Sequence, residues 1–326
     1  MKQYLPIAET GVPILFWGQP GTGKSSGVHS WADSHQLPCV TLVGSLSDPG
    51  DVVGFAVQSG DRVKFALPEW VDTLAHGGIL FLDEINRGCR LVRSAMLRLI
   101  AERSIHHYKL PDNVIIIAAA NSDGEVDDID SALSTRFLHL DWSVDTVDYV
   151  RQLRSNQWDT YGRLPADWES YLPSSRDAIA TFLESRSELL LTTNTGRGSG
   201  SPRTWDYAAK VLAGCQAMGL SSRIPLGGVV GEGPAKEYSA WYSKRDLPSP
   251  EAILAGQWKP GSRDQQRAAL LSILPLVKDN NSWLAAWKQV VRVRKDIALL
   301  VARSLASRRP ENCEVPEGLE HLEGVL

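Results

Sequence analysis

The segment WGQPGTGKSS, residues 17–26, limits more than any other what this chain can fold into. It contains the pattern GxxxxGK[ST], whose fixed positions are Gly18, Gly23, Lys24 and Ser25. An apolar run, residues 14–17, comes directly before it, and a helical pattern starts at Lys24. A glycine-rich loop between a buried strand and a helix is the setting in which this pattern holds phosphate groups. The segment therefore predicts a strand–loop–helix unit near the start of the chain.

Short apolar runs and helical patterns alternate over the first 143 residues. Continuous apolar runs of this kind are typical of strands buried on both faces, as in a parallel sheet covered by helices. The expected strands are residues 12–17, 39–43, 79–82, 114–119 and 137–140, and the expected helices are residues 24–34, 68–76 and 90–102. The sequence thus predicts an α/β core with a parallel sheet over residues 1–143.

Helical patterns dominate after residue 145. We expect a helical lid and C-terminal helical region over residues 144–309, followed by a mobile acidic tail, residues 310–326, which has five glutamates and no Lys or Arg. The other expected features of this part are loops at residues 192–201 and 221–234, and a long amphipathic helix, broken once, at residues 281–309.

The phosphate loop provides the first candidate site. Its glycines let backbone N–H groups point into one concavity, and the helix N-terminus adds the positive end of a dipole. Lys24 would reach the β- and γ-phosphates of a nucleotide, and the Ser25 hydroxyl would ligate Mg²⁺. The competing interpretation is a glycine-rich turn with a solvated lysine. The candidate nucleotide-binding residues are Gly18, Gln19, Pro20, Gly21, Thr22, Gly23, Lys24, Ser25 and Ser26.

Two adjacent acids follow the most apolar strand, in the stretch GGILFLDEINR at residues 77–87. In doubly wound sheets, ligands bind outside the carboxyl ends of the strands, where the phosphate loop also lies. We expect Asp83 to face the magnesium ion and Glu84 to polarise the water that attacks the γ-phosphate. Alternatively, the two acids are simply favoured at a helix N-terminus by its dipole.

Composition indicates an ordinary globular protein, with 326 residues, 43% hydrophobic content and a net charge of −4. This charge gives no global electrostatic case for nucleic acid or an anionic membrane as partner. The four cysteines form no CxxC pair, which favours a reduced, cytoplasmic setting without zinc or disulfides. The N-terminus lacks the apolar segment of a secretory signal, and the longest apolar runs are too short for a membrane helix.

Six segments in a fixed order make the chain resemble the AAA+ ATPases, and within them the MoxR and dynein-related branch. They are GQPGTGKS, DPGDVVG, FLDEINR, IIIAAANSD, STRF and SPRTWDYAAKVL, and they extend over about residues 10–210. DEINR favours this branch in particular. The resemblance implies a P-loop αβα core followed by an all-helical lid, Mg²⁺-dependent ATP hydrolysis and assembly into an oligomer, expected to be a hexamer. Residues beyond about 213 match no motif of the family.

The resemblance also assigns roles by position. Asn121 resembles sensor 1, which holds the attacking water, although a turn-forming asparagine is the alternative. Arg136 in STRF resembles the arginine finger that serves a neighbouring subunit's γ-phosphate, although a local salt bridge is also possible. Ser201 and Pro202 suit a helix start, which places Arg203 in the first turn, where the dipole disfavours a cation. A phosphate would compensate, and Arg203 resembles sensor 2. Arg87 either pairs across a subunit boundary or caps locally.

Two further segments resemble insertions of this branch, namely hairpins at residues 54–65 and 103–111 that handle partners at the pore or at one face of a ring. His106 and His107 in the second hairpin form a poor metal pair, because adjacent strand residues point to opposite faces. Residues 123–132 contain five acids, Asp123, Glu125, Asp127, Asp128 and Asp130, and are expected to be a solvated loop.

The favoured function is an ATP-driven machine of MoxR type that remodels a protein partner, which in this branch often carries a von Willebrand factor type A domain. A nucleic-acid-translocating or restriction-type motor, in some cases powered by GTP, is the alternative, and net acidity counts mildly against it. A non-hydrolysing scaffold conflicts with the complete set of hydrolytic residues. A small-molecule kinase would share the phosphate loop but would not need Asn121, Arg136 and Arg203.

Overall fold

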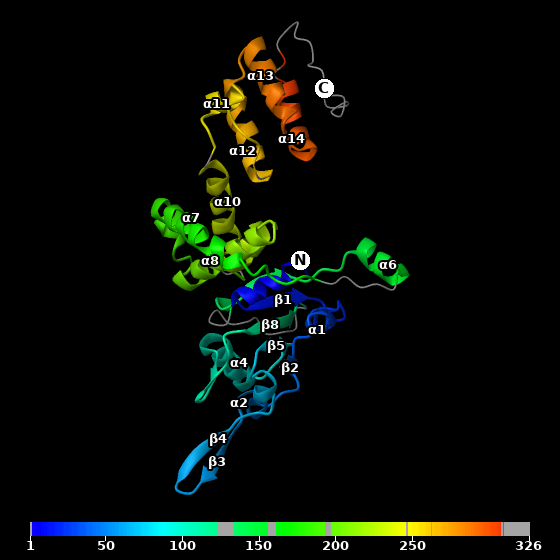
Figure 1. Ribbon diagram of the computed structural model, residues 1–326, viewed down its shortest axis with the longest axis vertical. Helices are drawn as coiled ribbons and strands as arrows, with labels where there is room; N and C mark the ends of the chain where they lie inside the picture. The colour runs from blue at the N-terminus through cyan, green and yellow to red at the C-terminus, as the bar shows by residue number, and fades with distance from the viewer. Residues whose placement is uncertain are drawn as a thin grey trace. The chain divides into compact units, whose positions relative to one another are not determined.

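The computed structural model describes residues 2–122, 134–155, 161–192, 197–245, 247–261, 263–307 and 309, and Figure 1 shows its elements. The chain forms two compact units, Met1–Ala235 and Lys236–Leu326. No helix among the described residues is long and apolar enough to cross a membrane. The expected acidic loop at residues 123–132 and the acidic tail lie outside the described residues.

The first unit contains a five-stranded, fully parallel sheet in the order β2-β5-β8-β1-β9. Its strands are β1 (Ile14–Gly18), β2 (Cys39–Val43), β5 (Gly78–Asp83), β8 (Val114–Asn121) and β9 (Leu138–Asp141). All five expected strands are therefore present, and the α/β prediction is confirmed. Every residue of β1 and β8 is buried, as expected for central strands covered on both faces.

The strand register places the polar residues at the carboxyl ends of neighbouring strands side by side. Gly18, where the phosphate loop starts, pairs with Asn121, and Val43 pairs with Asp83. Strands β5 and β8 extend past their apolar runs to include Asp83 and Asn121, because the ladder of backbone hydrogen bonds continues to the sheet edge. The candidate residues are thereby brought to one edge of the sheet.

The core helices are α1 (Lys24–Ser34), α2 (Pro49–Val53), α3 (Trp70–Thr73) and α4 (Arg90–Glu102). The helices expected at residues 24–34 and 90–102 are confirmed to the residue. The one expected at residues 68–76 is shorter. It ends at Thr73 and is followed by turn bonds from Ala75 N to Asp72 O and from Gly77 N to Leu74 O, where Gly77 takes a φ of 101°.

Both expected hairpins are present, as β3–β4 (Phe55–Ser59 and Arg62–Ala66) and β6–β7 (Ser104–Ile105 and Tyr108–Lys109). Every residue of β3 and β4 is exposed. The Phe65 ring stacks on the His106 ring, with centroids 3.7 Å apart, and so joins the two hairpins. Among the described residues, no group of three or more His, Cys, Asp or Glu could hold a metal ion.

Helices make up the rest of the first unit: η1 (Lys2–Thr10), α6 (Thr146–Ser155), η2 (Trp168–Tyr171), α7 (Leu172–Ser185), η3 (Ser187–Leu189), α8 (Pro202–Ala217) and α9 (Arg223–Val230), with the start of α10 (Glu232–Arg245). The loop expected at residues 221–234 is wrong, because α9 and α10 occupy it. Its glycines indicated a loop, but they serve close packing: a Cβ on Gly228 would lie 2.0 Å from the His139 carbonyl oxygen of β9.

The second unit consists of the rest of α10 and of α11 (Pro250–Leu254), α12 (Arg263–Ile273), η4 (Leu274–Leu276), α13 (Asn280–Val290) and α14 (Lys295–Ala306). The single break expected within residues 281–309 falls between α13 and α14. This unit has its own buried core, in which Trp258, Trp283 and Trp287 take part. The fold is a parallel α/β core followed by a helical C-terminal region. The domain boundaries expected at residues 143 and 309 stay predictions.

Candidate functional site

The phosphate loop leaves β1 at Gly18 and enters α1 with its backbone donors exposed. Gly21 and Gly23 take φ values of 76° and 84°, the left-handed region that favours glycine. Gly23 is the N-cap of α1 and offers no side-chain hydrogen bond to the first turn. A Cβ on either glycine would meet nothing within 4 Å, so open space adjoins the loop. The arrangement fits a phosphate group at the helix N-terminus.

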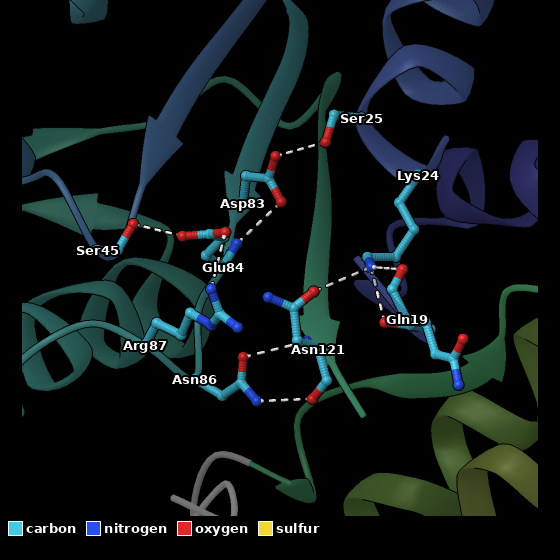
Figure 2. A network of polar contacts seen from close by, with 10 residues as sticks. Gln19, Lys24, Ser25, Ser45, Asp83, Glu84, Asn86, Arg87 and Asn121 are labelled. Atoms are coloured by element: carbon cyan, nitrogen blue, oxygen red, sulfur yellow. Dashed lines mark hydrogen bonds and ion pairs between the residues drawn. The ribbon is translucent and has the colours of Figure 1, made fainter. Parts of the chain in front are cut away.

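Lys24 lies with its ammonium at the centre of this loop, and only 6% of the residue is exposed. Its Nζ donates to the carbonyl oxygens of Gly18 at 2.8 Å and Gln19 at 3.0 Å, and to Asn121 Oδ1 at 3.1 Å (Figure 2). These three acceptors are neutral oxygens, and they orient the ammonium. A buried cation held in this way fits a polyanionic ligand such as a nucleoside triphosphate.

Ser25 and Asp83 are joined directly. The Ser25 hydroxyl donates to Asp83 Oδ2 at 2.5 Å, and the other carboxylate oxygen accepts from the Glu84 backbone N–H at 2.9 Å. Magnesium prefers oxygen ligands and is commonly bound by one or two protein groups together with water and substrate phosphates. The hydroxyl–carboxylate pair fits such an ion, and the expected metal ligands stay a prediction.

The backbone conformation of Glu84 and two side-chain contacts restrain this residue. Its backbone takes a left-handed φ of 50°, which is uncommon for a residue with a side chain. The Ser45 hydroxyl donates to Glu84 Oε2, and Arg87 Nη1 lies 3.6 Å from Oε1 (Figure 2). Arg87 therefore pairs with the candidate base of its own chain, and a role across a subunit boundary stays a prediction. Sequence reasoning missed Ser45, which lies just beyond β2 and far from the motif.

Asn86 holds the end of β8. Its side-chain amide donates to the Asn121 carbonyl oxygen at 2.9 Å and accepts from the Asn121 backbone N–H at 3.2 Å. Only 4% of Asn86 is exposed. This reciprocal pair fixes the backbone of the residue whose side chain contacts Lys24. Sequence reasoning left Asn86 unassigned, although an amide that follows a buried strand so closely is a signal that could have identified it.

The other loop residues support this arrangement to different degrees. The Thr22 hydroxyl donates to the Gln19 carbonyl oxygen at 2.7 Å, and Trp142 Nε1 donates to the Thr22 carbonyl oxygen at 3.0 Å. Both bonds hold the tip of the loop in place. Gln19, Pro20 and Ser26 are exposed.

The two candidate arginines lie outside the network of Figure 2. Ser201 caps α8 by accepting from the Thr204 backbone N–H, and Arg203 lies exposed in the first turn of this helix. Arg136 is half-buried, two residues before β9. Burial raises the pKa of Tyr207 on α8, while the positive charges of Arg203 and Arg136 lower it. The two arginines therefore act on the same half-buried tyrosine.

Comparison with known proteins agrees with this geometry. Residues 14–141 match the sequence profile described as "ATPase family associated with various cellular activities (AAA)". A protein of Thauera aromatica described as "Putative chaperone BssE" is 34% identical over 140 residues, which cover 39% of this chain and 48% of that protein. The chain thus matches about half the length of this curated relative.

A solved structure from Cytophaga hutchinsonii, described as a "putative ATPase", is 17% identical, with a TM-score of 0.44, over 72% of this chain and 78% of that one. The family profile spans all strands of the sheet, the phosphate loop and the acid pair. Residues 14–141 of this chain are therefore an AAA ATPase family domain.

Proposed function

We propose that the chain is a Mg²⁺-dependent ATPase of MoxR type that assembles into a hexameric ring and hydrolyses ATP to remodel a protein partner. The observation that carries this proposal is the polar network of Figure 2. It joins the phosphate loop at Lys24 and Ser25 to the acid pair and to Asn121, at the carboxyl ends of three parallel strands. Phosphoryl transfer needs little more than such positioned charges and a positioned water.

Each residue of the network would have a distinct task. The Lys24 ammonium would neutralise the β- and γ-phosphates. Ser25 and Asp83 would hold Mg²⁺, which supplies charge neutralisation between the same phosphates when it is bound. Glu84 would accept a proton from the attacking water, and Asn121 would orient that water through its side-chain amide.

Hydrolysis would also require the two arginines. We propose that Arg203 contacts the γ-phosphate of its own subunit from the lid, and that Arg136 contacts the γ-phosphate bound to the neighbouring subunit. A guanidinium suits the charge that spreads over the phosphoryl oxygens in the transition state. This assignment makes the oligomer necessary for turnover.

A protein partner is favoured over a nucleic acid. The Thauera relative is described as a chaperone, and the net charge of −4 offers no general attraction for phosphate backbones. A partner with a von Willebrand factor type A domain fits the branch that the sequence resembles. The setting that we propose is cytoplasmic.

The decisive experiment separates ATP binding from ATP hydrolysis. Glu84→Gln should keep ATP affinity and lower turnover by a factor on the order of 100 or more, because the general base is lost. Glu102→Gln is the matched control, since its carboxylate pairs with Arg98 on the exposed face of α4. Lys24→Ala should weaken ATP binding itself. If Glu84→Gln hydrolyses ATP at the wild-type rate, Glu84 is not the base.

The oligomeric part of the proposal has its own test. Subunits with Arg136→Ala and subunits with Glu84→Gln are each expected to be inactive as pure rings. Mixed rings should regain part of the activity, because an intact Arg136 then faces a site with an intact Glu84. Absence of recovery in rings that are shown to be mixed would contradict a finger that acts on the neighbouring site.

A further inference from the structure

Arg197 contacts Trp17 of β1 and Asp141 of β9. Its guanidinium carbon lies 4.2 Å from the centroid of the Trp17 ring, and its Nη1 lies 2.5 Å from Asp141 Oδ1. Trp17 is 8% exposed and immediately precedes Gly18, where the phosphate loop starts. Arg197 therefore joins a segment near the start of α8 to the ends of β1 and β9.

A chain of hydrogen bonds leads from the Trp17 side chain back to the Arg197 backbone. Trp17 Nε1 donates to His139 Nδ1 at 2.9 Å, so the proton of the neutral imidazole is on Nε2, which donates to the Ser134 carbonyl oxygen at 2.8 Å. The Ser134 hydroxyl in turn donates to the Arg197 carbonyl oxygen at 2.8 Å. Burial lowers the pKa of His139 to about 4 and so keeps its imidazole uncharged at neutral pH. Ser134 begins the STRF segment that carries Arg136.

The residues after Arg197 are packed too closely to shift independently. We name residues 197–201 the strap. A Cβ on Gly198 would lie 2.7 Å from Gly231 N, and a Cβ on Gly200 would lie 2.4 Å from Leu189 O. The strap ends at Ser201, the N-cap of α8, two residues before Arg203. A displacement at Arg197 would therefore be transmitted over a short, glycine-packed path to the first turn of α8.

We propose that Arg197 is a positioning residue for ATP hydrolysis, which holds the strap against Trp17 and Asp141 and thereby places Arg203, and through Ser134 also Arg136, relative to the phosphate loop. This inference rests on the proposed function. A misplacement of about 1 Å in a catalytic group can cost a factor on the order of 100 in rate. A planar guanidinium can stack on Trp17 and pair with Asp141 at once, whereas an ammonium serves only the second contact well.

The test compares Arg197→Ala with Arg197→Lys in the full chain. Arg197→Ala should lower kcat for ATP about tenfold and change KM less than about threefold, because the phosphate loop stays intact while the arginines are misplaced. Arg197→Lys, which keeps the charge for Asp141, should recover part of kcat. The matched control is Arg176→Ala, since Arg176 is also exposed and pairs at 3.4 Å with Asp206, which is not a strap residue. It should leave kcat unchanged.

Hydrogen exchange of peptides covering residues 197–201 gives a readout that does not depend on hydrolysis. Arg197→Ala should raise exchange in these peptides, and Arg176→Ala should not. Faster exchange with a lowered kcat supports the inference, whereas unchanged exchange or an unchanged kcat in Arg197→Ala overturns it. If Arg197→Ala fails to fold, Arg197→Lys provides the test. The role of the Arg197–Trp17 stack is overturned if this variant keeps the wild-type kcat, KM, hydrogen exchange and stability. A wild-type chain that binds ATP without hydrolysing it contradicts the proposed function, and the exchange result then still shows whether Arg197 anchors the strap.

Discussion

Asn86 shows how one residue can set the position of another without contacting the ligand. Both hydrogen bonds of its amide go to the backbone of Asn121, whose side chain contacts Lys24. Because Asn86 is buried, its partners have no water to replace it. Its role in the DEINR segment is thus to hold the end of β8 against the end of β5.

Asn86→Ala should lower both stability and turnover. It leaves a buried N–H and a buried C=O of Asn121 unpaired, at about 1–3 kcal/mol each. Turnover should fall about tenfold, because the Asn121 amide would no longer be fixed, while ATP affinity should change little. Asn113→Ala is the control, since Asn113 is exposed and donates to the His76 carbonyl oxygen. Urea unfolding and steady-state kinetics measure the two effects, and equal behaviour of both variants would contradict this role.

His139 predicts a dependence of stability on pH. Burial lowers its pKa in the folded chain from 6.5 to about 4. Above pH 6.5 the imidazole is neutral in both the folded and the unfolded chain. Between pH 6.5 and 4 the unfolded chain binds a proton at His139, whereas the folded chain does not. The free energy of unfolding should therefore fall as the pH drops from 6.5 towards 4, by about 2 kcal/mol at pH 5.

The measurement compares urea unfolding of the wild type and of His139→Gln at pH 7 and pH 5. Glutamine does not titrate, so this part of the pH dependence should disappear from the variant, whatever its stability at pH 7. Identical losses of stability in the two proteins between these pH values would show that His139 does not carry the effect.

The site could be predicted from the sequence where its residues lie within contiguous motifs. Lys24, Ser25, Asp83, Glu84 and Asn121 each come after an apolar run in the sequence, and parallel strands bring such positions to one edge. Ser45 and Arg197 could not be found in this way. Their partners lie 39 residues away at Glu84 and 56 residues away at Asp141, and no local pattern specifies such contacts.

At the scale of elements, strands were predictable and lid helices less so. Buried parallel strands are continuous apolar runs, and all five were found in the sequence. Helix α9 was missed because RIPLGGVV contains a proline and two glycines, which locally favour a loop. Tertiary packing overrides this preference: Leu226, Val229 and Val230 are buried, and Gly228 allows close approach to β9.

Gly228→Ala tests this account of α9. The added Cβ would lie 2.0 Å from the His139 carbonyl oxygen, so helix or strand must move. We expect a loss of about 1–3 kcal/mol in the free energy of unfolding. Gly162→Ala is the control, because a Cβ there would meet nothing within 4 Å, and its effect should stay within about 1 kcal/mol. Thermal or urea unfolding measures the change. If Gly228→Ala leaves the free energy of unfolding unchanged, α9 does not pack as closely against β9 as this account requires.

At the scale of the whole molecule, the candidate site and the second core are separate. The phosphate loop, the acid pair and Asn121 all lie within Met1–Ala235. Lys236–Leu326 has its own buried tryptophans, held by bonds such as Trp283 Nε1 to Leu305 O at 2.8 Å and Trp258 Nε1 to Gln289 Oε1 at 2.9 Å. Nucleotide binding therefore should not require the second unit.

A chain that ends at Arg245, the last residue of α10, is expected to bind ATP with a dissociation constant within about threefold of that of the full chain. The physical reason is that the loop, its anchors Trp142 and Asn121, and the strap all belong to the first unit. Titration with a fluorescent ATP analogue in the presence of Mg²⁺ measures the constant, and Lys24→Ala in the same shortened chain is the control for specific binding. Loss of binding in a shortened chain that retains its circular dichroism would mean that the second unit contributes to the site. Retained binding with lost turnover would instead assign the second unit to assembly or to the motion that follows binding.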